Sequence, residues 1–212
     1  MATPIWSFSL TILVILFLFQ VFKNRFPRIK ILVAARIGTI TSCVAVLFGL
    51  VYYTYAQFIV WQSDSLSQAF LPPYQGYGYF IQYSLYRFWA QYLVAVVVAL
   101  VFLFLARRHN RKHDDKFFYP EESYFLLLGI FLSGHPLWIG YFVAVIVGYA
   151  IFSAGYTAWW RKKYPERANE TPRVSFYYGW LSTAILVILL KSAILKFPPL
   201  AILIFATNTV VL

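Results

Sequence analysis

The chain has 212 residues, of which 61% are hydrophobic, 21% aromatic and 12% charged, and its mean hydropathy is +0.69. Charged residues make up about a quarter of an ordinary soluble domain, so this composition excludes one. The formal net charge of +11 invites a nucleic-acid interpretation, but the basic residues gather at the ends of apolar runs. That placement is typical of topology determinants and anionic-lipid anchors. We therefore predict an all-α, polytopic membrane helical bundle whose partners include the lipid bilayer and anionic lipid headgroups, and no nucleic acid.

Three basic clusters, within 23–30, 107–116 and 161–173, hold 14 of the 18 lysines and arginines. Positively charged loops stay on the cytoplasmic side of a membrane, so all three clusters are expected there. The first apolar run has no basic residue before it and is followed at once by Lys23 and Arg25. This order is the reverse of a cleavable signal peptide and predicts an extracytoplasmic N-terminus.

A helix that crosses the hydrocarbon core needs about 20 apolar residues. The predicted spans are 5–22, 37–61, 88–106, 119–134, 137–158 and 176–190. A seventh crossing at 198–212 competes with an interfacial or re-entrant segment, so one integral membrane domain over 1–212 contains six or seven transmembrane helices. The predicted cytoplasmic loops are 23–30, 107–118 and 159–175. Arg36, just before the second span, is expected to reach back to the cytoplasmic interface.

The segment 62–87 is the predicted extracytoplasmic loop. It contains Pro72-Pro73, two glycines and five tyrosines. Proline and glycine exclude a long regular helix in its first half. Because tyrosine favours the headgroup layer, we expect this chain to lie there. An aromatic-lined ligand site is the alternative.

Glu121 and Glu122, which follow Pro120, are the acidic residues closest to a predicted apolar span. An ionisable group at that position is a functional candidate by default. The alternative is a structural role, because proline is tolerated in the first helical turn and carboxylates complement the positive end of the helix dipole. If the chain has a site, we expect it at the cytoplasmic mouth of the span 119–134.

Motifs for cofactors and metals are not evident. His109 and His113 have the spacing of two ligands on one helix face, but their neighbours are mostly cations, which disfavour a metal. There is no P-loop, no HExxH motif and no GxSxG elbow. We therefore predict neither a cofactor nor a metal.

The hairpin between the second and third basic clusters resembles the C-terminal half of type IV prepilin peptidases, which are polytopic membrane aspartyl proteases. The segment 120–129, PEESYFLLLG, resembles the family's second catalytic motif and the helix after it, with Glu121 at the aspartate position counted back from Gly129. The helix 139–160, the loop RKKYPERANETPR and VSFYYG at 174–179 resemble the rest of the layout. The resemblance covers 119–180.

The chain departs from that pattern at chemically important positions. Pro120 replaces the family's glycine, Glu121 its aspartate and Ser123 its lysine, and no upstream motif supplies the other catalytic aspartate. Aspartyl catalysis needs two carboxylates that share a proton. The candidate catalytic residues are therefore Glu121 and Glu122 with Asp114 or Asp115, if the loop that holds the aspartates folds back.

These observations predict a degenerate prepilin-peptidase-like protein that lacks the aspartyl dyad and acts as a membrane scaffold or partner of other membrane proteins or prepilin-like peptides. The first alternative is an active membrane peptidase or lipid-modifying transferase that uses the carboxylates. The second is a small transporter or channel subunit, which the lack of ionisable groups in mid-span disfavours. The single cysteine, Cys43, and the lack of targeting signals are consistent with a bacterial inner membrane.

Overall fold

The computed structural model describes residues 3–22, 28–112, 119–167 and 176–194, and the regular elements in these ranges are all helical. The α-helices are α1 (Thr3–Val21), α2 (Arg28–Ser63), α3 (Gly78–Ser84), α4 (Ala90–Lys112), α5 (Glu122–Ser133), α6 (Leu137–Lys163), α7 (Gly179–Leu189) and α8 (Lys191–Ile194). A π-helical stretch, η3 (Leu85–Trp89), joins α3 to α4, and short 3₁₀ turns, η2 (Ser67–Phe70) and η4 (Pro165–Arg167), follow α2 and α6. The prediction of an all-α fold is confirmed for these residues.

Three helical stretches are long and apolar enough to cross a membrane. They are Ile31–Ser63, Gly78–Lys112 and Leu137–Lys163. Three further apolar helices, Trp6–Val21, Glu122–Ser133 and Gly179–Leu189, are shorter. The described chain is thus a helical bundle of membrane type with three candidate spans, and the expectation of six or seven crossings goes beyond them.

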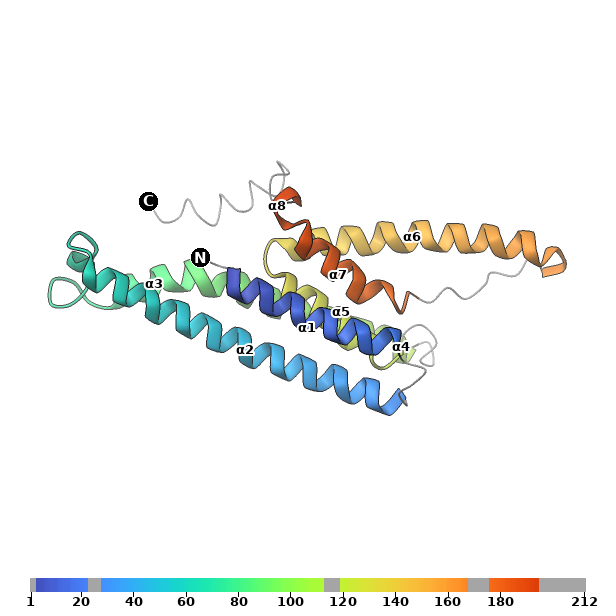
Figure 1. Cartoon of the computed structure of the whole chain (residues 1–212), viewed down its shortest axis with the longest axis horizontal. Coiled ribbons are helices and arrows are strands. Elements are labelled where there is room, and N and C mark those ends of the chain that lie inside the picture. Colours follow the sequence, from blue (N-terminus) through green and yellow to red (C-terminus); the bar gives the residue numbers. More distant parts are fainter. Residues whose placement is uncertain (1–2, 23–27, 113–118, 168–175, 195–212) are drawn as a thin grey trace.

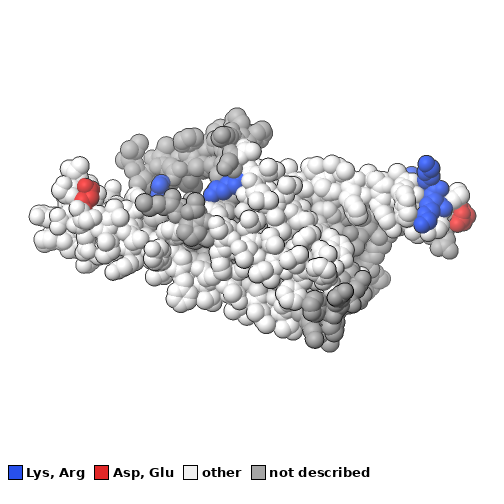
Figure 2. Space-filling model, viewed as in Figure 1, with Lys and Arg blue, Asp and Glu red and all other residues white. Residues whose placement is uncertain are grey.

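Large apolar side chains cover the outward faces of the three long helices. Phe48 on α2 is 70% exposed, Val97 on α4 is 62% exposed and Ile151 on α6 is 69% exposed. Exposing apolar surface to water costs roughly 25 cal/mol per Å², so faces of this size are unfavourable in water. Figure 2 shows an uncharged surface along the molecule, with charged atoms at its two ends and in one area beside the grey atoms. Such faces are typical of helices in contact with lipid.

The short helix α5 lies at the centre of the bundle and packs against α1, α2, α4, α6 and α7 (Figure 1). Every residue from Glu122 to Ser133 is buried except Tyr124. A helix that is apolar around its whole circumference is expected to be buried in this way. Its 12 residues extend for only about 18 Å, less than the hydrocarbon thickness of about 30 Å.

The turn between α5 and α6 is itself buried. Ser133, Gly134 and Pro136 are buried among the helices. Their polar groups are bonded within the protein: the Ser133 hydroxyl donates to the Gly129 carbonyl at 2.7 Å and the His135 N–H to the Gln91 carbonyl at 3.1 Å. Irregular backbone inside a membrane protein is tolerated where neighbours bond it in this way.

Gly134 ends α5 with φ 68° and ψ 172°. This region of backbone conformation is essentially restricted to glycine, because a Cβ would meet the neighbouring carbonyl oxygen. The turn that reverses the chain between α5 and α6 therefore depends on a residue without a side chain.

Successive helices run back and forth along the long axis (Figure 1). The end of α1, the start of α2, the end of α4, the start of α5, the end of α6 and the start of α7 all point toward the same end of the molecule. Two basic clusters, Arg107–Lys112 on α4 and Arg161–Lys163 on α6, therefore point in one direction, as does the start of α2 near Arg36.

Several helices extend past the predicted boundaries. α2 begins at Arg28, before the predicted span 37–61, the helical stretch that contains α4 begins at Gly78 and ends at Lys112, and α6 continues to Lys163. Lysine and arginine are good helix formers, and cations near a helix C-terminus complement its dipole. Basic residues that were expected to form loops therefore lengthen the helices.

The segment 62–87 forms an aromatic cluster at the far end of α2. Trp61, Leu71 and Phe80 are buried together, with Phe58 and Tyr83 packed against them. The Trp61 and Tyr83 ring centroids are 4.9 Å apart. As expected, the first half of the segment 62–87 contains no long helix and only the short turn η2. The second half contains α3, whose aromatic rings pack on α2.

Candidate functional site at the start of α5

The start of α5 is fixed by local hydrogen bonds. The Tyr119 N–H donates to Glu122 Oε2 at 3.2 Å, and the Ser123 hydroxyl donates to the Pro120 carbonyl at 2.9 Å. A glutamate in the first turn that accepts a bond from the backbone just before the helix satisfies a donor that would otherwise lack an intrahelical partner. The capping role that the sequence suggested for Glu122 is therefore present in this geometry.

Both glutamates are buried. Glu121 is 5% exposed and Glu122 is 3% exposed. Both side chains interact with Tyr177, which lies just before α7 and is itself buried. Burial of a carboxylate is unfavourable unless other polar groups compensate it, and the Tyr119 N–H provides one such group for Glu122.

Tyr177 links three helices at this point. The rings of Tyr119 and Phe125 lie edge-on to it, with centroid distances of 5.9 and 6.0 Å. Gln20 of α1, whose side chain is fully buried, donates from Nε2 to the Tyr177 carbonyl. The glutamates therefore belong to a contact that joins α1, α5 and the chain entering α7.

The other acidic residues that the structure describes are Asp64 and Glu166. Asp64 directly follows α2, where the Ser67 hydroxyl donates to it at 2.6 Å, and this bond lowers the pKa of the Asp64 carboxyl. Glu166 is exposed in η4 beyond α6. Asp114 and Asp115, our candidate partners, lie outside the described residues. Within the described part of the chain, neither Asp64 nor Glu166 is placed to share a proton with Glu121.

A basic groove opens beside this contact, between α2, α4 and the start of α5. Its volume is about 560 Å³. Tyr124 lies in it, with the guanidinium carbon of Arg107 4.9 Å and that of Arg36 5.7 Å from the ring centroid. The lining residues are Leu32, Arg36, Ala106, Arg107, Asn110, Arg111, Tyr119, Pro120, Ser123 and Tyr124. The groove is therefore suited to an anion.

Sequence reasoning missed two partners of this region. Tyr177 is 55 residues away from Glu122 in the chain, and nothing in the local pattern indicates their contact. Arg36 was expected only to reach the interface, whereas it lies on Tyr124 together with Arg107. The sequence did contain one indication of this contact: Arg36 lies near the start of one apolar run and Arg107 at the end of another. The positive-inside rule places both of these ends at the same membrane face.

The fold and the site define an all-helical bundle of membrane type with a buried pair of glutamates at one helix start and a basic groove next to it. No family model, no curated protein and no solved structure matches the chain. The function is therefore inferred from the geometry.

Proposed function

We propose that the chain is a bacterial inner-membrane protein, with six or seven crossings and an extracytoplasmic N-terminus, that is distantly related to type IV prepilin peptidases. In this proposal Glu121 and Glu122 hold helices together and cut no peptide bond, and the protein acts as a scaffold or partner of other membrane proteins. The observation that carries it is the inward packing of both carboxylates against Tyr177.

The requirements of aspartyl catalysis support this proposal. Such catalysis requires two carboxylates that share a proton and that are open to water and to the scissile bond. Side chains that are 5% and 3% exposed leave little room for a peptide. The open space nearby is lined by Arg36, Arg107 and Arg111.

The competing hypothesis is an active membrane peptidase in which Glu121 pairs with Asp114 or Asp115. We expect purified protein in lipid to leave a panel of prepilin-type leader peptides intact, as measured by mass spectrometry of the products. Cleavage that Glu121→Gln or Asp114→Asn/Asp115→Asn abolishes would overturn the proposal. A known prepilin peptidase with the same panel controls for substrate quality.

A further inference from the structure

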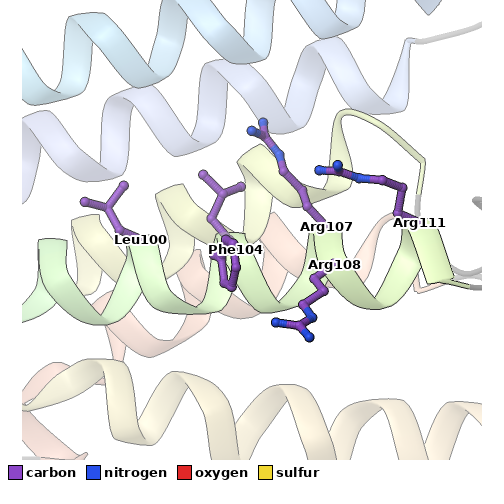
Figure 3. Close-up of a pocket in the computed structure, with 6 residues that line it drawn as sticks. Leu100, Phe104, Arg107, Arg108 and Arg111 are labelled. Atoms are coloured by element: carbon purple, nitrogen blue, oxygen red, sulfur yellow. The ribbon is translucent and has the colours of Figure 1, made fainter.

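One face of α4 carries an apolar stripe that continues into a basic one. Leu100, Leu103 and Phe104 are followed by Arg107, Arg108 and Arg111 at helical spacing, and the six residues line a groove of about 480 Å³. Figure 3 shows these side chains along the helix, with Arg107 and Arg111 pointing to one side and Arg108 to the other. The stripe, which we call the α4 stripe, is about 17 Å long at 1.5 Å per residue.

The apolar part of the α4 stripe is open to its surroundings. Leu100 is 53% exposed and Phe104 is 60% exposed. Both lie on one of the three helices that are long and apolar enough to cross a membrane. A hydrocarbon chain can therefore lie along them.

The basic part is held in place by packing. The guanidinium group of Arg107 lies over the ring of Tyr124, and Arg36 approaches the same ring from α2. Stacking of a guanidinium group on an aromatic ring restricts its orientation. Among the described residues that line this groove and the neighbouring one, none is a carboxylate.

We propose that the α4 stripe, together with Arg36, is a binding site for an anionic phospholipid. The phosphate is bound by the guanidinium groups of Arg36, Arg107 and Arg111, and an acyl chain lies along Leu100, Leu103 and Phe104. Guanidinium groups bind phosphate oxygens through paired, charge-assisted hydrogen bonds. A free phosphate would satisfy the arginines alone, whereas the exposed apolar residues directly below them match a ligand that carries a hydrocarbon chain.

The test is titration of the purified full-length protein with phosphatidylglycerol, followed by native mass spectrometry of the first lipid bound. The Arg107→Gln/Arg111→Gln variant is expected to weaken this binding by about tenfold or more. The Arg161→Gln/Lys162→Gln variant removes two exposed charges from the end of α6 and is the matched control, with binding expected to remain at the wild-type level. Equal losses in the two variants would show diffuse charge attraction and overturn the site.

Two further experiments test whether the site requires guanidinium groups and whether its ligand is a lipid or a soluble anion. Arg107→Lys/Arg111→Lys keeps the charge but loses the planar fork, so we expect binding between that of the wild type and the Gln variant. Wild-type binding by this variant would contradict a site formed by guanidinium groups. Glycerophosphoglycerol, which has the headgroup without acyl chains, is expected to compete poorly. Full competition by it, or by inorganic phosphate, would assign the groove to a soluble ligand and overturn the lipid proposal.

Discussion

The Gly129→Ala variant is expected to lose about 1–3 kcal/mol of unfolding free energy, because the added methyl group overpacks the centre of the bundle. That methyl would lie 2.9 Å from Cε2 of Tyr141 and closer still to its Cζ and hydroxyl. Tyr141 is fully buried between α5, α6 and α7, so its ring has little room to move. Denaturation in mixed micelles, followed by circular dichroism, measures the change.

Gly155→Ala is the matched control for this prediction. Gly155 lies on the exposed face of α6 and has no atom within 4 Å of an added Cβ, so alanine there is expected to be neutral or stabilising. In a Tyr141→Leu background the cost of Gly129→Ala is expected to shrink, because the clashing ring is gone. The same cost in both backgrounds would show that the Gly129–Tyr141 contact does not determine the packing.

Glu122→Ala is expected to lower the unfolding free energy by about 1–3 kcal/mol, because the part-buried Tyr119 N–H loses its acceptor. Glu121→Ala is expected to act in the same direction through Tyr177. The sign distinguishes the two hypotheses, since active sites are commonly maintained at a cost in stability and removing a catalytic carboxylate tends to be neutral or stabilising. The same micellar denaturation measures both variants.

Glu166→Ala is the control for these two variants, because Glu166 is an exposed glutamate just past α6 and its removal is expected to change stability by less than about 0.5 kcal/mol. A wild-type or higher stability of both Glu121→Ala and Glu122→Ala would contradict the structural role.

The hairpin of α5 and α6 shows how far the sequence alone predicts this fold. The apolar runs on either side of Ser133–Pro136 predict two helices, and the structure places α5 and α6 on either side of that turn. The sequence did not predict that α5 is too short to span on its own or that the turn is buried. Apolar character is the same whether a residue faces lipid or protein, so hydropathy does not distinguish the buried α5 from the exposed faces of α2 and α6.

The candidate site was predicted only in part. Local rules indicated that Glu121 and Glu122 could stabilise the start of a helix, and Glu122 bonds the Tyr119 N–H there. The contact with Tyr177 and the stacking of Arg36 and Arg107 on Tyr124 arise from residues far apart in the chain. Such contacts depend on how the helices pack. Asp114 and Asp115 lie outside the described residues, so their proposed pairing with Glu121 stays a prediction.

The proposed topology requires α5 and α6 to return the chain to the membrane face from which it entered. Single cysteines replacing exposed Asp64, Lys112 and Lys163, in a Cys43→Ser background, report the side of each position through a membrane-impermeant maleimide applied to intact cells. We predict labelling at position 64 from outside, and labelling at 112 and 163 only after the membrane is opened. Labelling of 112 and 163 from opposite sides would contradict the bundle described here.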